Sequence, residues 1–148
     1  MLIRLIVPGE IARVEDLNTS LEAVLTRHGI DAGVRGDVRL IVEELASNAI
    51  EHGEGRDVVL TIGANQTAVA VTVRDHGVGF SATQAHQVFT RFWRADSSRQ
   101  RTVGGSGLGL SIAKAIVTAH HGTITVTSEP GATVFEVSLP ARPADPAV

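Results

Sequence analysis

Hydrophobic side chains recur along the chain with a helical period in three segments. In residues 10–28 and 34–52 they recur every three or four positions, which places them on one face of a helix. Gly29 and Gly53 follow these segments, and glycine readily adopts the left-handed conformation that often ends a helix. Residues 108–121 return to the same spacing, so the pattern predicts three main helices.

Five short runs rich in β-branched residues predict strands. They occupy residues 2–7, 58–62, 69–73, 123–128 and 133–139. The turn-forming Gly63 and Asn65 separate the second run from the third, and Pro130 and Gly131 separate the fourth from the fifth. Both pairs therefore predict antiparallel hairpins. This order of elements indicates an α/β (α+β) two-layer sandwich, with three main helices on one face of a mixed, mainly antiparallel sheet.

Residues 77–106 have no regular period, and a loop of this length in a compact domain usually has a function. We expect it to contain a short helix and to cover a ligand. Its cluster of Val88, Phe89, Phe92 and Trp93 is informative because only 3% of the residues are aromatic. The cluster either anchors the loop to the core or belongs to a lid whose arginines reach phosphates or an acidic partner. Those arginines are Arg91, Arg94, Arg99 and Arg101.

Length and composition are those of one compact domain, with 148 residues of which 43% are hydrophobic. We assign this domain to residues 1–140 and expect residues 141–148, which contain two prolines, to form a disordered tail. The net charge of −3 argues against nucleic acid or anionic lipid as a partner, so any phosphate binding must be local. The lack of cysteine excludes disulfides and thiolate metal sites. The apolar run in residues 2–7 is too short to span a membrane, so we expect a cytoplasmic chain.

Glu44 and Asn48 lie four residues apart in the second predicted helix, so they share one face of it. A carboxamide oxygen is a suitable ligand for Mg²⁺, which commonly bridges nucleotide phosphates. A nearby carboxylate can position or deprotonate a hydroxyl group or water that attacks the terminal phosphate. Together with Glu51, these residues could instead form the solvated face of an amphipathic helix. This segment alone favours that simpler interpretation.

Asp75 ends the third predicted strand and is followed by Gly77 and Gly79. A carboxylate in this place can accept a hydrogen bond from the exocyclic amine of adenine, whereas it would repel the carbonyl oxygen of guanine. The two glycines would let the backbone pass close to the ring and adopt positive φ. This pattern therefore predicts ATP over GTP, although Asp-x-Gly is also common in ordinary turns.

A glycine-rich stretch, residues 104–109, opens the third predicted helix. Its exposed backbone N–H groups and the positive end of the helix dipole would form a cradle for phosphate oxygens. The stretch is not a Walker loop, because no Gly-Lys-Ser/Thr follows, and its spacing is not that of dinucleotide-binding folds or protein kinases. A flexible linker is the alternative, but a linker would not usually lead directly into a helical pattern.

Four segments in order resemble the N, first glycine, F and second glycine boxes of the GHKL superfamily. They are Glu-Leu-Ala-Ser-Asn-Ala at residues 44–49, Asp-His-Gly-Val-Gly-Phe at 75–80, Phe-Thr-Arg-Phe at 89–92 and Gly-Ser-Gly-Leu-Gly-Leu at 105–110. The resemblance covers about residues 34–140 and implies a Bergerat-type ATP-binding fold with a lid at about residues 81–104. The aromatic box and the glycine box are most similar to those in the catalytic domain of bacterial sensor histidine kinases.

The resemblance also implies the roles of single residues. Asn48 would hold Mg²⁺ and Asp75 would bind adenine. Glu44 is the candidate catalytic residue on the chemical grounds given above, independently of the resemblance. The remaining expected ATP contacts are His52, Gly77, Gly79, Phe80, Arg94, Gly105, Ser106, Gly107, Leu108, Gly109 and Leu110.

Two features depart from the histidine kinase pattern. Those kinases usually have Asn at the position of Glu44 and a basic residue followed by an aromatic one at the positions of Glu51 and His52. In these positions, and in its first strand and helix, the chain is similar to the anti-sigma-factor serine kinases. In addition, none of the six histidines is followed by an acidic residue and then proline, as in a phosphoacceptor helix.

The sequence thus predicts an ATP-binding kinase domain that transfers the γ-phosphoryl group of Mg-ATP to a histidine on a separate phosphoacceptor domain or response-regulator system. One alternative is an anti-sigma-type serine kinase, whose partners would be a sigma factor and its antagonist. Another is a non-catalytic, ATP-dependent binding module in which the lid reports the nucleotide state to a partner.

Overall fold

Nine helices and strands are seen in the part of the chain that the computed structural model describes. That part comprises residues 2–7, 13–52, 56–77, 79, 81–85, 87–89 and 109–141. The strands are β1 (Leu2–Val7), β2 (Val58–Ala64), β3 (Ala68–Asp75), β4 (Thr123–Glu129) and β5 (Ala132–Pro140). The helices are α1 (Arg13–Arg27), α2 (Ala32–His52), α3 (Ala82–Ala85) and α4 (Gly109–Ala119).

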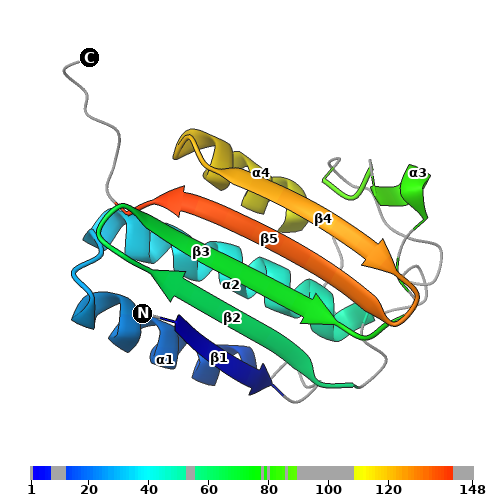
Figure 1. Ribbon diagram of the computed structural model, residues 1–148, viewed down its shortest axis with the longest axis horizontal. Helices are drawn as coiled ribbons and strands as arrows, with labels where there is room; N and C mark the ends of the chain where they lie inside the picture. The colour runs from blue at the N-terminus through cyan, green and yellow to red at the C-terminus, as the bar shows by residue number, and fades with distance from the viewer. Residues whose placement is uncertain are drawn as a thin grey trace.

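The five strands form one sheet in the order β1-β2-β3-β5-β4, with β1 and β4 at its edges (Figure 1). Each of the four pairings among these described strands is antiparallel. Two pairings come from the predicted hairpins, and a third joins the hairpins through β3 and β5. In that third pairing Asp75 lies opposite Thr133. The predicted two-layer sandwich with a mainly antiparallel sheet is confirmed, but the expectation that the sheet is mixed is wrong for the described strands, which pair only antiparallel.

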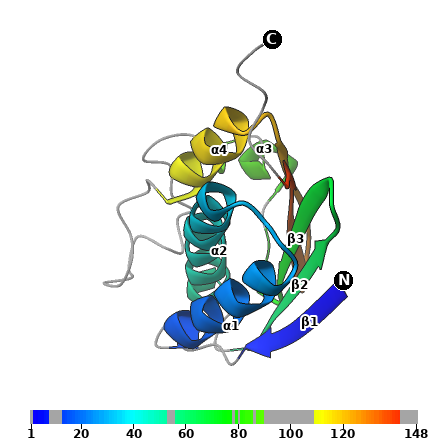
Figure 2. The ribbon, with the colours of Figure 1, turned by 90° about the vertical axis from the view of Figure 1, so that its left-hand side faces the viewer.

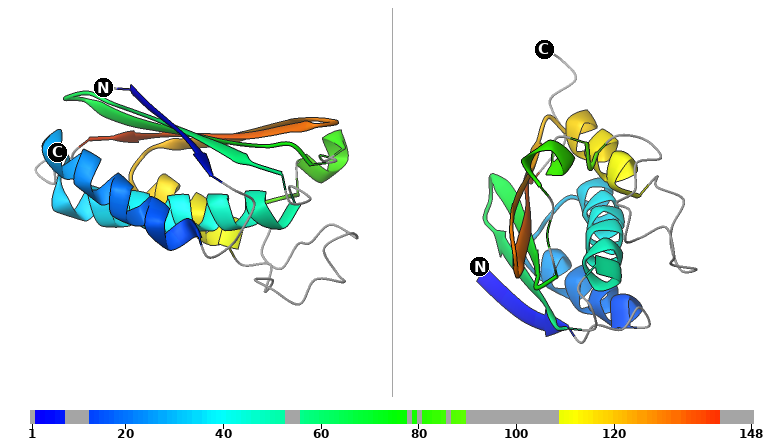
Figure 3. Two further views of the ribbon diagram at one scale, coloured as in Figure 1. Left: turned by 90° about the horizontal axis from the view of Figure 1, so that it is seen from below. Right: turned by 90° about the vertical axis from the view of Figure 1, so that its right-hand side faces the viewer.

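All three long helices cover the same face of the sheet, as Figure 2 and Figure 3 show. The core lies between the two layers. It is built from the apolar positions that the helical and strand periods of the sequence predict. In α1 these are Leu17, Leu21 and Leu25, one helical turn apart. Every second residue of β2 points inward, because side chains alternate between the faces of a sheet. The largest fully buried side chain is Phe135, on the central part of β5.

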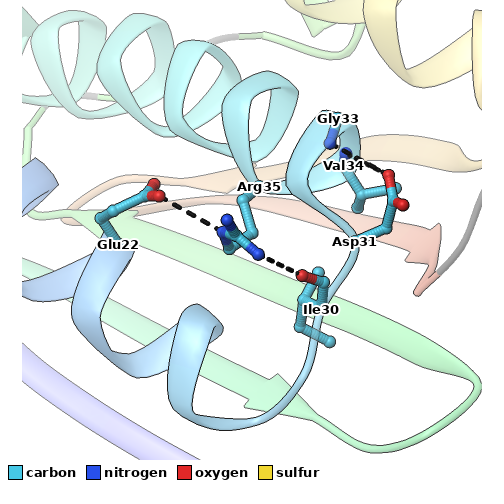
Figure 4. A network of polar contacts seen from close by, with 6 residues as sticks. All are labelled: Glu22, Ile30, Asp31, Gly33, Val34 and Arg35. Carbon is cyan, nitrogen blue, oxygen red and sulfur yellow. Dashed lines mark hydrogen bonds and ion pairs between the residues drawn. The ribbon is translucent and has the colours of Figure 1, made fainter.

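A capped junction connects α1 to α2 (Figure 4). Gly29 has a φ of 72° and follows the end of α1, as predicted. Asp31 then accepts hydrogen bonds through Oδ2 from the N–H groups of Gly33 at 3.0 Å and Val34 at 3.4 Å. This N-cap explains why α2 begins at Ala32, two residues before the predicted start.

Arg35, on α2, makes two further hydrogen bonds at the same junction (Figure 4). Its guanidinium group donates from Nη1 to the carbonyl oxygen of Ile30 at 2.6 Å and from Nε to Glu22 Oε1 on α1 at 3.3 Å. Both bonds join α2 to the chain segment that precedes it. The first two helices are therefore held by polar contacts as well as by the core.

The predicted short helix within the long loop is α3. Ser81 and Gln84 cap it reciprocally, since Ser81 Oγ accepts from the Gln84 N–H at 3.1 Å and Gln84 Oε1 accepts from the Ser81 N–H at 2.9 Å. Val88 is buried, and the ring of Phe89 meets Phe135 edge to face with centroids 6.0 Å apart. The first half of the aromatic cluster therefore anchors the loop to the core. Phe92, Trp93 and the four arginines lie outside the described residues.

Ala141 belongs to the folded domain, although the sequence placed it in the tail. It is buried, and its N–H donates to the carbonyl oxygen of Thr67 at 3.0 Å. Residues 142–148 lie outside the described part of the chain. None of the helices in the described ranges has the length and hydropathy needed to cross a bilayer.

Candidate nucleotide site

The second half of α2 carries the two polar residues that the sequence singled out. Glu44 and Asn48 are both partly buried, one turn apart on this helix. The Nδ2 atom of Asn48 is buried and has no hydrogen-bond partner among the described residues. An unpaired buried N–H donor is costly unless an acceptor, such as an oxygen atom of a ligand, engages it. The Nδ2 atom of Asn48 is therefore not part of a solvated face, although the residue as a whole is partly exposed.

Glu44 faces the start of α4. One of its carboxylate oxygens, Oε2, occupies the space in which a side chain at Gly109 would begin. Burial raises the pKa of the Glu44 carboxyl group, and the negative charge of Glu43 raises it further. The tertiary fold thus brings together two residues from separate predicted motifs, the N box and the second glycine box.

Asp75 lies at the C-terminal end of β3, as predicted, and is only 2% exposed. Its Oδ1 atom accepts a hydrogen bond from the Gly77 N–H at 2.9 Å. Burial raises the pKa of the Asp75 carboxyl group, while the bond from Gly77 and the nearby His76 act in the opposite direction. The turn that the sequence offered as an alternative is present. The buried carboxylate distinguishes it from an ordinary surface turn.

The β4–β5 hairpin holds the backbone that follows Asp75. The Gly131 N–H donates to the Gly77 carbonyl oxygen at 2.9 Å, and His76 Nδ1 lies 3.3 Å from the Gly131 carbonyl oxygen. Gly79 has a φ of 83°, and a Cβ atom there would lie 2.7 Å from Ser128 Oγ. The predicted positive φ is confirmed at Gly79, but the prediction is wrong for Gly77, whose φ is not positive. In the structure the close neighbour that requires glycine at this position is the hairpin.

Thr133 is a polar residue of the site that the sequence analysis missed. It lies opposite Asp75 on β5, is 1% exposed, and its Oγ1 is 2.8 Å from Ser128 Oγ. The sequence contained a signal for it. Thr133 occupies an inward-facing position of β5, and the other inward-facing residues are the apolar Phe135, Val137 and Leu139. A hydroxyl group in this series indicates a polar partner inside the fold.

These residues come from elements that meet at one end of the molecule. The second half of α2, the start of α4 and the C-terminal end of β3 lie toward the same end in Figure 1 and Figure 3. The site combines a buried acceptor at the sheet with an amide and a carboxylate on the helical layer. Such a mixture can bind a base at one side and a charged group at the other.

Several predicted contacts are not placed in the structure. Phe80, Arg94, Gly105, Ser106, Gly107 and Leu108 lie outside the described residues, and so does the side chain of His52 at the end of α2. The Leu110 side chain packs in the core, so only its backbone is left for the predicted contact with ATP.

Comparison with known proteins gives a consistent picture. Residues 33–143 match the family model described as "Histidine kinase-, DNA gyrase B-, and HSP90-like ATPase". The sensor histidine kinase MtrB of Mycolicibacterium paratuberculosis is 38% identical over 145 residues, covering 84% of this chain and 26% of MtrB. The probable sensor histidine kinase TcrY of Mycobacterium tuberculosis is 46% identical over 101 residues, covering 68% of this chain and 21% of TcrY.

Two solved structures share the fold. The mycobacterial sensor histidine kinase MprB superimposes with a TM-score of 0.64 at 25% identity, covering 97% of this chain and 99% of that one. Full-length ShkA in complex with AMPPNP gives a TM-score of 0.63 at 23% identity, covering 90% of this chain and 30% of ShkA. The chain spans about a quarter or less of the length of MtrB and TcrY.

Proposed function

Because the chain belongs to the family of histidine kinase-, DNA gyrase B- and HSP90-like ATPases, we propose that it binds Mg-ATP and transfers the γ-phosphoryl group to a histidine in two-component signalling. The curated relatives MtrB and TcrY, both sensor histidine kinases, favour this acceptor over serine. A separate domain or chain would supply the histidine, since no histidine here lies in a phosphoacceptor motif. A reaction of this kind, which uses ATP, also suits a cytoplasmic location.

The single observation that carries the proposal is the buried carboxylate of Asp75 at the end of β3. A buried acceptor needs a donor, and the exocyclic amine of adenine is such a donor. The Oδ1 atom already accepts from Gly77, which orients the carboxyl group. Thr133 adds a buried hydroxyl group on the neighbouring strand. In this proposal Asp75 selects adenine over guanine.

Asn48 is the proposed ligand of Mg²⁺. Its side chain is partly buried on α2, and its carboxamide oxygen is of the kind that Mg²⁺ prefers. The buried Nδ2, which has no partner among the described residues, would need an acceptor, and a phosphate oxygen can supply one. When bound, Mg²⁺ would neutralise charge on the phosphates. The phosphates themselves would lie near the N-terminus of α4, where backbone N–H groups and the helix dipole favour negative charge.

Glu44 is the proposed catalytic residue. Its raised pKa, caused first by burial, brings the carboxyl group closer to the range in which it can accept a proton from an attacking group. Residues 81–104 would form the lid, in which α3 and the anchored Phe89 provide the described part. Arg94 and His52 are proposed to contact ATP from the lid and from the end of α2.

Labelled ATP tests the proposed reaction directly. The protein is incubated with [γ-³²P]ATP, Mg²⁺ and either the phosphoacceptor domain of a sensor histidine kinase or a serine-containing antagonist of an anti-sigma factor. The labelled product is then treated with acid and with alkali. We expect an acid-labile, alkali-stable phosphohistidine on the acceptor. An acid-stable label on a serine antagonist would support the anti-sigma-type kinase. ATP binding without any labelled acceptor would support the non-catalytic module.

A further inference from the structure

Strand β4 forms an edge of the sheet whose backbone is paired on one side only. It pairs with β5, and no described residue hydrogen-bonds to the other side of residues 123–127. A free edge presents a row of N–H and C=O groups with which another strand can pair. Helix α3 contacts β4 and lies toward the end of the sheet where β4 ends (Figure 1, Figure 3). The start and middle of β4 are therefore the part that is open to pairing.

The two edges of the sheet differ in their protection against such pairing. Strand β1 carries the exposed Arg4, and Pro8 follows it in the chain. Charged residues and proline are common features of sheet edges that do not pair with other chains. Between Thr123 and Ser128, β4 has neither a charged residue nor a proline, and most of its residues are β-branched. Of the two edges, β4 is the one suited to pairing.

Polar and apolar side chains alternate along β4. Ile124 and Val126 are half-buried and pack against the core. Thr123, Thr125 and Thr127 are exposed and point to the opposite face, which the helices do not cover. The run is symmetric about Thr125, because the residues at equal distances on either side of it are of the same class.

This symmetry makes β4 complementary to itself in an antiparallel register. Thr125 would lie opposite Thr125 of a second copy, and Thr123 would lie opposite Thr127. Ile124 would lie opposite Val126. The apolar pairs would then share the face that packs on the helices, and the threonine pairs would share the other face. Cross-strand pairs of these kinds stabilise a sheet.

Other registers lose this match. If the centre of symmetry moves to Ile124, Val126 lies opposite Gly122 of the second copy. If it moves to Val126, Ile124 lies opposite Ser128. In both cases an apolar side chain loses its apolar partner, and a changed register is costly where one face of a strand is buried. The pattern of side chains thus favours the register centred on Thr125.

We propose that β4 pairs antiparallel with β4 of a second copy of this chain, about a two-fold axis at Thr125, so that two five-stranded sheets join into one. The ends of the pair are complementary too. Glu129 and His121 are exposed, and this register brings the carboxylate of one copy near the imidazole of the other, which can donate a hydrogen bond to it. The joined edges lie outside the nucleotide site, so the proposal does not depend on the proposed function.

Cysteine cross-linking tests the register, because the chain has no cysteine of its own. Opposite residues in an antiparallel pair have Cα atoms about 4.5–5.5 Å apart, which a disulfide can span. We expect Thr125→Cys to form an intermolecular disulfide under mild oxidation. Thr123→Cys is the matched control and should form much less, because its two copies are offset by about 13 Å along the strands. Equal cross-linking of the two variants, or none in either, contradicts the proposal.

A pair of charge variants tests the same contact in solution. Thr123→Lys is combined either with Thr127→Lys or with Thr127→Glu, at exposed positions that face each other only between copies. A contact between two strands buries little area, so sedimentation equilibrium is measured at chain concentrations up to about 1 mM.

We expect the average mass of the unaltered chain to rise with concentration toward that of two chains. The variant with two lysines should associate about tenfold more weakly than the variant with lysine and glutamate, because like charges oppose each other in it. An unaltered chain that stays monomeric, or equal association of the two variants, would show that β4 does not form this pair.

Discussion

At the scale of single residues, Asp75 combines burial with charge. It lies opposite Thr133 of β5 in the sheet, and its side chain accepts a hydrogen bond from the Gly77 N–H. Burial raises its pKa, so the folded chain binds this proton more tightly than the unfolded chain does. Ionisation of Asp75 therefore lowers stability as pH rises through its folded-state pKa. A residue that destabilises the free protein at neutral pH is typical of a binding site.

The substitution Asp75→Asn should separate the effect of the carboxylate charge on stability from its effect on ATP binding. At pH 7 we expect a higher thermal midpoint, because the ionised carboxylate is removed while the bond from Gly77 can be kept. The gain should shrink as the pH falls toward 3.8, the ordinary pKa of the group. Mg-ATP affinity should fall by about tenfold or more, because a charged acceptor is lost. Thermal scans across pH measure the midpoint, and calorimetry measures the affinity for Mg-ATP.

Asp57→Asn, at an exposed position before β2, is the matched control and should change neither property. Full ATP affinity in Asp75→Asn would remove Asp75 from the nucleotide site. A lower midpoint at pH 7 would show that its ionised form stabilises the fold.

At the scale of elements, the β4–β5 hairpin supports the turn after β3. Gly131 binds Gly77 through its backbone, and Gly79 packs directly against Ser128. Gly79 and Gly131 share the same φ of 83° but differ in their surroundings. A Cβ atom at Gly131 would meet nothing within 4 Å, whereas one at Gly79 would also lie 2.9 Å from the Glu129 carbonyl oxygen. This pair allows backbone strain and steric overlap to be measured separately.

We expect Gly131→Ala to lower the free energy of unfolding by about 1 kcal/mol, since alanine disfavours positive φ. Gly79→Ala adds a steric overlap with backbone and should cost about 1–3 kcal/mol more. Urea unfolding followed by circular dichroism gives both values. Equal losses in the two variants would mean that the turn relaxes away from the hairpin without cost.

At the scale of the whole molecule, the site joins segments that are far apart in the chain. Asp75 and Thr133 belong to the sheet, whereas Glu44 and Asn48 belong to the helical layer. Gly109 joins the site from α4. A ligand that contacts both layers should stabilise the fold as a unit, because it binds only the folded chain.

Mg-ATP should therefore raise the thermal midpoint by several degrees at saturation. At about 100 times its Kd, the ligand adds about 2.7 kcal/mol to the free energy of unfolding. Asn48→Ala should reduce the shift to the size seen with ATP and EDTA, because the proposed magnesium ligand is lost. Ser47→Ala, one position earlier on α2, is the control and should retain the full shift. A shift in Asn48→Ala that still depends on Mg²⁺ would contradict the role of Asn48.

The periods of the hydrophobic pattern determined the helices and strands of the fold. Helical and strand periods are local properties, so α1, α2, α4 and the two hairpins were predicted to within a few residues. The order of the motifs also determined the family, because each motif is a short run of the chain. The start of α2 was less accurate, because the pattern of apolar residues does not reveal the side-chain cap of Asp31.

Only the tertiary structure decided which residues meet. The pairing of Asp75 with Thr133 and the contact of Glu44 with Gly109 both join segments separated by more than 50 residues. Such contacts depend on strand register and on the packing of helices against the sheet, neither of which is encoded in a local period. For this reason the sequence identified Glu44 as a solvated or catalytic carboxylate, and the fold placed it against the first turn of α4.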